Sequence, residues 1–428
     1  MITIVLFSVF FVTLLMGVPI AFSVGFAAIT ALYLTGIPLF VAFQRMFGGV
    51  DSFTLLAIPF FIFMGNVMEK GGIARRIVAF ANILVGQLRG GLAAVNVLAS
   101  MFFAGISGSA VADTSSIGSM LIPMMNEEGY ERNFTVAITC TSSTIGLIIP
   151  PSNTMILYSF VAGGVSIAQL FAAGIVPGVL VGLSLMAVGF IVSVKRGYPR
   201  HPRPSLKEIK RTIRETSLSL FIVVVIVGGI LGGVFTATEA AVFGVVYCLI
   251  ITMLIYRELK PVDLPEVMRK TIYTTVVVVF LIATSTAFSY VMAVERIPQV
   301  LARLLLSITE SRIVLLLLIN IMLLLVGMVM DMSPAILIFT PILLPIVTQL
   351  GMSPVHFGIM MLVNLCVGLC TPPVGTVLFV GMSMGGTNIS QLIRPLLMFL
   401  TPMLVVLLLV TYVEPITMMI PNMLFGIR

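Results

Sequence analysis

Two long stretches without Asp, Glu, Lys or Arg place the strongest restriction on how this chain can fold. Residues 133–194 and 332–393 each run for 62 residues without a charged side chain. A helix of about 20 apolar residues crosses the hydrocarbon core of a bilayer, and each stretch holds more than one such length. The chain is 59% hydrophobic and 9% charged. These values indicate an all-α polytopic membrane protein, because a transmembrane β-barrel would show short alternating segments instead.

Ten apolar runs predict membrane-spanning helices. They lie near 2–16, 18–35, 53–69, 134–161, 168–194, 217–234, 239–256, 271–292, 355–383 and 389–413. The first run has no basic residue before it and no small-residue cleavage site after it, so we expect a retained span and not a signal peptide.

The charges predict the topology. Residues 195–216 carry eight basic and two acidic side chains, and a short basic loop between spans is expected to be cytoplasmic. Five spans precede it, which places the N-terminus outside. We interpret the net charge of +7 as this topology signal and expect no nucleic-acid partner. The predicted organisation is a first repeat at 1–195, a basic cytoplasmic connector at 196–216 and a second repeat at 217–428.

The two halves share a repeated motif. "GLIIPPSNT" at 146–154 and "GLCTPPVGT" at 368–376 match at Gly, Leu, both prolines and the final Thr, with an offset of 222 residues, and further Gly and Pro positions match at the same offset. Paired prolines interrupt a helix. With five spans in each half, the second copy inserts upside down. An inverted repeat with matching helix breaks is typical of secondary transporters, whose site lies near the membrane midplane.

Two further runs, 92–125 and 314–347, are interrupted by Gly, Ser, Asp and Pro and look too short for two full spans. We expect each to form a re-entrant hairpin of two half-helices with a polar tip. Asp113 and Asp331 are the only carboxylates in these runs, and an intramembrane carboxylate is a functional candidate. For Asp113, a helix cap at the hairpin tip is an equally open interpretation. No Lys or Arg lies in either hairpin or in the broken helices at 134–161 and 355–383.

Breaks in mid-membrane expose carbonyl groups that suit a hard cation such as Na⁺, and N–H groups that suit an anion. A plain proline kink would explain a single break, but it explains poorly two breaks in register that each have polar residues beside them. The candidate sodium-binding residues are Ser107, Ser109, Asp113, Ser143, Thr144, Asn153, Gly327, Asp331, Thr371, Gly375 and Thr376. The candidate substrate-binding residues are Pro151, Ser152, Thr154, Asn364 and Pro373. We expect no catalytic residue and no other metal.

Four motifs resemble the large membrane subunit of tripartite ATP-independent periplasmic (TRAP) transporters: "GISGSAVADTSSIGSM", "CTSSTIGLIIPPSNT", "GVFTATEAA" and "GLCTPPVGT". The likeness covers essentially the whole chain. The resemblance implies an elevator mechanism, Na⁺ as the coupling ion without another cofactor, a periplasmic substrate-binding protein and a small membrane subunit with about four spans. It also implies a multi-pass protein of the bacterial cytoplasmic membrane. This chain has no such subunit fused ahead of its first span, so we expect a separate polypeptide.

The resulting hypothesis is Na⁺-driven uptake of a small carboxylate, of the sialic acid or C4-dicarboxylate type. One alternative is a stand-alone divalent-anion/Na⁺ symporter, which needs no binding protein. A remote alternative is a rhomboid-like intramembrane protease, because "GISG" at 105–108 matches the pattern around a catalytic serine. That chemistry needs a membrane-embedded histidine base, and paired helix breaks have no use in it. We therefore predict that the chain is not an enzyme.

Overall fold

The computed structural model describes residues 2–309 and 311–426, without the side chains of 104–107, 305, 306 and 308. Over these residues the regular elements are twenty α-helices and four short 3-10 or π helices. Eight helical segments are long and apolar enough to cross a membrane. The prediction of an all-α polytopic membrane protein is confirmed.

The first half of the chain contains ten α-helices and two 3-10 helices. They are α1 (Ile2–Leu15), α2 (Ile20–Thr35), α3 (Phe40–Val50), η1 (Phe53–Leu56), α4 (Ala57–Lys70), α5 (Ile73–Val85), α6 (Gly91–Ser107), α7 (Ala110–Glu127), α8 (Arg132–Ser143), η2 (Ile145–Leu147), α9 (Asn153–Val161) and α10 (Ile167–Arg196).

The second half follows the same order after a non-helical connection. It contains α11 (Leu206–Leu231), α12 (Ala237–Leu249), η3 (Ile250–Ile255), η4 (Pro261–Asp263), α13 (Leu264–Val294), α14 (Ile297–Ile308), α15 (Arg312–Val329), α16 (Met332–Gln349), α17 (Pro354–Leu369), α18 (Thr376–Gly385), α19 (Ile389–Tyr412) and α20 (Pro415–Phe425).

Both hairpins are present. Two residues, Gly108 and Ser109, connect α6 to α7, and Met330 and Asp331 connect α15 to α16. The arms differ from the prediction in length, because each has 17 or 18 residues and is not a half-helix. The prolines that interrupt the hydropathy, such as Pro123 in α7, lie inside the helices and do not end them.

The two broken helices cross at equivalent positions of the two repeats. Cys366 Sγ donates to the Thr144 carbonyl at 3.2 Å, and Cys370 Sγ donates to the Cys140 carbonyl at 3.3 Å. Thr144 and Cys366 are 222 residues apart, which is the offset of the sequence repeat. Contact between equivalent residues is the mark of an approximate two-fold axis, as in an isologous interface. The axis therefore passes between the two helix breaks.

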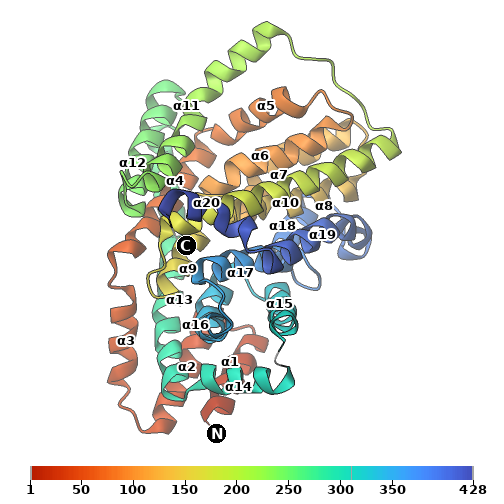
Figure 1. Ribbon diagram of the computed structural model, residues 1–428. Helices are drawn as coiled ribbons and strands as arrows, with labels where there is room; N and C mark the ends of the chain where they lie inside the picture. Colours follow the sequence, from red (N-terminus) through yellow and green to blue (C-terminus); the bar gives the residue numbers. More distant parts are fainter. Residues whose placement is uncertain (1, 310, 427–428) are drawn as a thin grey trace.

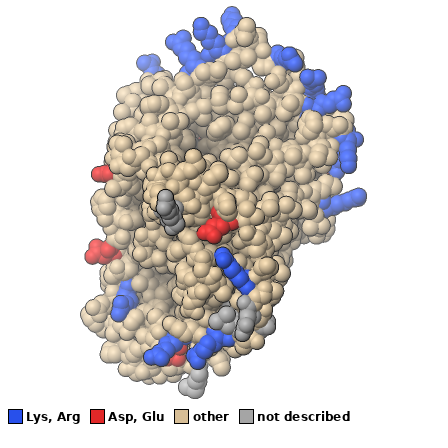
Figure 2. Space-filling view, in the orientation of Figure 1, with Lys and Arg blue, Asp and Glu red and all other residues tan. Residues whose placement is uncertain are grey.

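The helices form two bodies. In one, α13 packs against α2, α3 and α4, and α12 packs against α4; we call these helices the scaffold. In the other, hairpins pack on broken helices, with α6 and α7 on α8, α15 on α17, and α16 on α9. Figure 1 shows the N-terminus at one end of the molecule and the connection between α10 and α11 at the other. Lys and Arg side chains gather around that second end in Figure 2, and the topology predicted from charge places it in the cytoplasm.

Candidate functional site

A cavity of about 360 Å³ lies where the hairpin tips and the helix breaks meet. The hairpin tips contribute Ser109 and Asp331, and the breaks contribute Asn153 and Thr376. Helices α4 and α13 of the scaffold form the opposite wall. We call this space the central cavity. It lies between the two bodies, and not within either one.

Pairs of equivalent residues line the central cavity. Leu147 and Leu369, Thr154 and Thr376, and Ser109 and Asp331 are each separated by the repeat offset of 222 residues. The cavity therefore straddles the approximate two-fold axis. The last pair breaks the symmetry, because a hydroxyl stands on one side and a carboxylate on the other.

The tip of the first hairpin lies directly against the first break. A Cβ atom added to Gly108 would lie 2.3 Å from Asn153 Nδ2, so any other residue here would force the Asn153 side chain to move. Gly108 also has a φ of +63°, a conformation that favours glycine. The second pair is joined by a hydrogen bond from the Gly375 backbone N to the Met328 carbonyl at 3.3 Å. Each break is thus placed by the hairpin of its own repeat.

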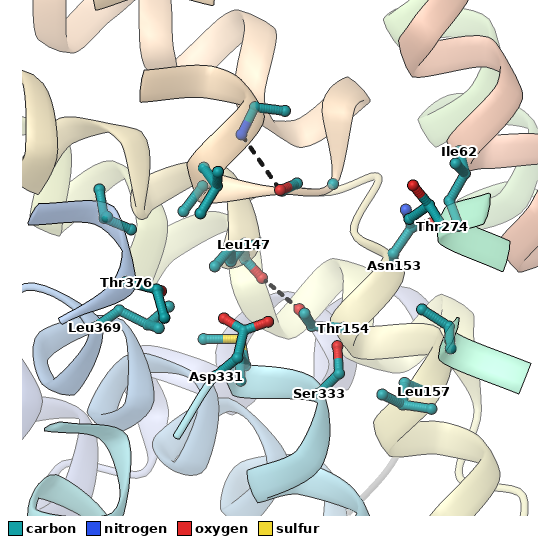
Figure 3. A pocket seen from close by; sticks show the side chains of 18 of the residues that line it. Ile62, Leu147, Asn153, Thr154, Leu157, Thr274, Asp331, Ser333, Leu369 and Thr376 are labelled. Carbon is teal, nitrogen blue, oxygen red and sulfur yellow. Dashed lines mark hydrogen bonds between the residues drawn. The ribbon is translucent and has the colours of Figure 1, made fainter. Parts of the chain in front are cut away.

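Asp331 is the N-cap residue of α16 and lines the central cavity. Figure 3 shows its carboxylate between Thr376 and Thr154, close to Leu147. Thr154 Oγ1 donates to the Leu147 carbonyl at 3.1 Å. Thr376 Oγ1 is buried close to the Asp331 carboxylate, although the two groups do not form a full hydrogen bond among the described residues. Carboxylate, carbonyl and hydroxyl oxygens together are the ligands that a hard cation prefers.

Asp113 lies apart from the central cavity and is fully buried in the first turn of α7. Ser100 and Ser143 lie close to its carboxylate, although neither oxygen of Asp113 makes a hydrogen bond within the described part of the chain. The alternative interpretation of Asp113 as the helix cap is wrong. The cap of α7 is Ser109, whose Oγ accepts a bond from the Ala112 backbone N at 3.3 Å.

The structure brings five of the predicted site residues to the central cavity and leaves most of the others outside it. Those at the cavity are Ser109, Asn153, Thr154, Asp331 and Thr376. Thr154 was predicted to bind substrate and the other four to bind sodium, so ion and substrate candidates share one space. Those that do not line it are Asp113, Ser143, Thr144, Gly327, Thr371, Gly375, Pro151, Ser152, Asn364 and Pro373. The side chain of Ser107 lies outside the described residues.

Several of the outlying residues have packing contacts instead. Gly327 lies against Gly368, with no space for a side chain between their helices. Asn364 Nδ2 donates to Asn320 Oδ1 at 2.8 Å and joins α17 to α15. Ser152 Oγ donates to the Leu147 carbonyl at 2.7 Å and shapes the break from within.

Sequence reasoning missed the scaffold side of the cavity. Lys270 of α13 lines it together with Asn66 of α4 and Thr274 of α13. Lys270 Nζ donates to Glu69 Oε2 at 2.6 Å. The hairpins and broken helices indeed contain no Lys or Arg, but the opposite wall supplies one. In the sequence, Lys270 is simply a basic residue directly before the apolar run 271–292. Nothing in the neighbouring residues indicates that it lies at the site.

Two helical hairpins and two crossed, broken helices around a polar cavity define a membrane transporter of the inverted-repeat type. Residues 7–416 match the family described as "Tripartite ATP-independent periplasmic transporter, DctM component", and the chain belongs to this family. With its apolar helices, this membership makes it a multi-pass protein of the bacterial inner membrane.

Three relatives illustrate the family. The chain is 42% identical to the isethionate TRAP transporter permease protein of Oleidesulfovibrio alaskensis, over 97% of this chain and 65% of that protein. It is 39% identical to the sialic acid large permease protein of Vibrio cholerae, over 96% of both. It is 36% identical to the C4-dicarboxylate large permease protein of Rhodobacter capsulatus, over 98% and 99% respectively.

Two solved structures share the fold. The YdaH transporter of Alcanivorax borkumensis aligns with a TM-score of 0.61 at 15% identity, over 89% of this chain and 90% of that one. MtrF of Neisseria gonorrhoeae aligns with a TM-score of 0.62 at 14% identity, over 86% and 82% respectively.

Proposed function

We propose that this chain catalyses Na⁺-driven uptake of a small organic anion through the central cavity. Relatives at 36–42% identity are named for isethionate, sialic acid or C4-dicarboxylates. Two of these are carboxylates and the third is a sulfonate, so the proposed substrate class is wider than the small carboxylates expected from the sequence. The single observation that carries the proposal is the central cavity, where cation ligands and anion-binding groups converge on the two-fold axis.

The ligands available at Asp331 support a sodium site. Its carboxylate supplies a full negative charge, and the Leu147 carbonyl and the hydroxyls of Thr154 and Thr376 lie around it. Oxygen-only ligation suits Na⁺, whereas softer metals prefer His and Cys. Over the described residues, no three His, Cys, Asp or Glu side chains come together in a way that could hold another metal. The cation would also offset the charge of Asp331 when an anion enters.

Helix N-termini and one lysine support anion binding. α9 begins at Asn153 and α18 begins at Thr376, so free backbone N–H groups lie at the cavity. The N-terminus of a helix attracts anions through these groups and through its dipole. Lys270 adds a positive charge from the scaffold side. A carboxylate or sulfonate thus finds its ligands on both walls.

The position of the cavity between two bodies supports an elevator mechanism. Hairpins and breaks form one wall, and α4 and α13 form the other. Sliding the first body along the scaffold would carry the bound ion and anion across the membrane. We propose that a periplasmic binding protein delivers the anion and that a small four-span subunit extends the scaffold, as the word tripartite in the family description suggests.

Reconstitution tests the proposed function. The chain, its small membrane subunit and its binding protein would be assayed in proteoliposomes with radiolabelled isethionate, sialic acid and succinate. We expect uptake of one of them with an inward Na⁺ gradient, and little uptake with K⁺ replacing Na⁺. Omitting either partner should abolish uptake. Robust Na⁺-driven uptake by this chain alone would instead favour the stand-alone symporter.

A further inference from the structure

A second cavity of about 380 Å³ lies beside the central one, and most of its lining residues do not line the central cavity. Helix α7 lines it with Ser115, Ser116 and Ser119, which we call the serine face. The opposite wall carries Arg75 of α5 and Glu258 of the connection between α12 and α13. Like the central cavity, it separates a hairpin from the scaffold.

The two cavities adjoin. Ser115 lines both of them. Glu69 lines the second cavity and Lys270 lines the central one, and these two side chains form an ion pair at 2.6 Å. The Ser115 hydroxyl and the Lys270–Glu69 ion pair therefore lie at the boundary between the two cavities. An anion that leaves the central cavity along α7 would pass Lys270 before it reaches Arg75.

Arg75 can exchange its partner for an anion. Glu258 Oε1 contacts Arg75 at 2.9 Å and Arg76 at 2.7 Å. Arg76 is fixed further by a stack on the Tyr256 ring at 3.6 Å, and its side chain is 19% exposed, whereas that of Arg75 is 68% exposed. If Arg75 turns to an incoming anion, Glu258 keeps Arg76, so no carboxylate is left without a cation.

The three hydroxyls of the serine face differ in their hydrogen bonds. Ser115 Oγ donates to the Ala112 carbonyl and Ser119 Oγ donates to the Ser116 carbonyl, both at 2.9 Å. Ser116 Oγ is buried and has no hydrogen-bond partner among the described residues. A buried hydroxyl without a partner is costly unless a ligand or water satisfies it. The Oγ atom itself is shielded from the second cavity, so it can donate to an anion there only after the Ser116 side chain changes rotamer.

We propose that the second cavity is a transient binding site for the transported carboxylate or sulfonate, between the central cavity and the cytoplasm. This proposal rests on the proposed function. Lys270 and Arg75 are successive cations on the route, and each already has a carboxylate partner. Pre-neutralised cations bind an anion weakly enough to release it, which passage through several sites requires.

The local charge is tested by labelling a chain in which Ser119→Cys is the only reactive thiol. The four native cysteines are buried and would be replaced by alanine. The probes are the anionic reagent MTSES and the cationic reagent MTSET, and the measurement is the ratio of their labelling rates. Arg75→Gln should lower this ratio about fivefold, because one charge acts oppositely on the two probes. Arg75→Lys should preserve it. Arg211→Gln, which removes an arginine 78% exposed on α11, is the matched control and should leave it unchanged.

The route is tested with Ser333→Cys as a reporter in the central cavity. In inside-out membrane vesicles, MTSES reaches the protein from the cytoplasmic side only. Ser119→Trp fills the second cavity and should slow labelling of the reporter at least tenfold, whereas Ser119→Ala should not. Ser119→Phe serves as a second obstruction if the Trp variant does not assemble.

The second site would be rejected if the MTSES-to-MTSET rate ratio were the same with and without Arg75. It would also be rejected if the Ser333→Cys reporter were labelled at the same rate in the Ser119→Trp and Ser119→Phe variants as in the chain with Ser119. Neither measurement uses transport, so such a failure leaves Na⁺-driven uptake untouched. Absence of uptake by the complete wild-type system would instead reject the proposed function.

Discussion

Asp331 combines three properties that no other described carboxylate shares: it occupies the N-cap position of a helix, lines the central cavity and lies between two threonines of the helix breaks. We predict that Asp331→Asn raises the Na⁺ concentration for half-maximal uptake about tenfold, because an amide offers a dipole where the carboxylate offers a full charge. Expression and membrane insertion should stay near normal. The measurement is uptake against Na⁺ concentration in proteoliposomes.

Asp263→Asn, at a partly buried helix start that lines neither cavity, is the control for that substitution. Asp113→Asn and Thr376→Ala complete the series. A Na⁺ response that is unchanged in Asp331→Asn, Asp113→Asn and Thr376→Ala alike would leave the breaks as packing features and would reject the coupling proposal.

Gly368 illustrates a residue whose importance comes from contact and not from chemistry. A Cβ atom added there would lie 2.7 Å from Gly327 Cα, which is backbone and cannot move aside. We predict that Gly368→Ala destabilises the protein by about 1–3 kcal/mol through overpacking, measured as a lower melting temperature in detergent. Gly228→Ala is the matched control, because nothing lies within 4 Å of the added Cβ on α11. Equal melting temperatures for the two variants would contradict the close packing.

Polar residues near the breaks could be found from the sequence, because a hydroxyl or carboxylate in an uncharged stretch is conspicuous. Asp331, Thr376 and Asn153 were identified in this way and lie at the cavity. Lys270 could not be found, because its place depends on how α13 packs against another body. Gly327 was assigned to ion binding because it falls in the repeat, and only the structure reveals its contact with Gly368.

At the scale of elements, helices that are apolar all round were predicted well and amphipathic ones were missed. α3, α5 and α14 lie between the predicted spans, and each exposes some apolar side chains while burying others. Hydropathy alone does not separate such helices from loops. The breaks were predicted because paired prolines have a strong local effect. The hairpin arms were predicted too short, because a proline in the sequence predicts the end of a helix even where the helix continues through it.

The contact between α15 and α17 gives a prediction at this scale. Asn364 was a substrate candidate, but its Nδ2 donates to the Asn320 carbonyl at 2.9 Å and to Oδ1 of the same residue at 2.8 Å. Asn364→Leu should cost about 1 kcal/mol, as for other interhelical bonds in membranes, and should leave the apparent KM for substrate unchanged. Thermal unfolding and uptake kinetics are the two readouts. A changed KM with an unaltered melting temperature would restore the substrate role.

At the scale of the whole molecule, the repeat and the charge pattern carry the prediction of topology. The repeat explains why two breaks and two hairpins meet, since a two-fold axis brings equivalent segments together. It does not say which end faces the cytoplasm. That assignment rests on the distribution of basic residues, chiefly those of the connector, because Lys and Arg are retained on the cytoplasmic side during insertion. The assignment of the cytoplasmic end also decides the side of the membrane on which each cavity opens. The proposed exit past Arg75 depends on this assignment.

Labelling of single cysteines tests this topology directly. We expect Ser311→Cys, at the exposed start of α15, to react with an impermeant maleimide in intact cells whose outer membrane has been permeabilised. Ser205→Cys, in the basic connector, should react only after the inner membrane is also opened, because eight basic residues hold its segment in the cytoplasm. Replacing the four buried native cysteines removes competing thiols. The labelled Ser205→Cys fraction after full permeabilisation controls for reactivity. If Ser205→Cys reacts as fast as Ser311→Cys before that step, the second repeat does not insert upside down relative to the first, and the release route along α7 would face the wrong compartment.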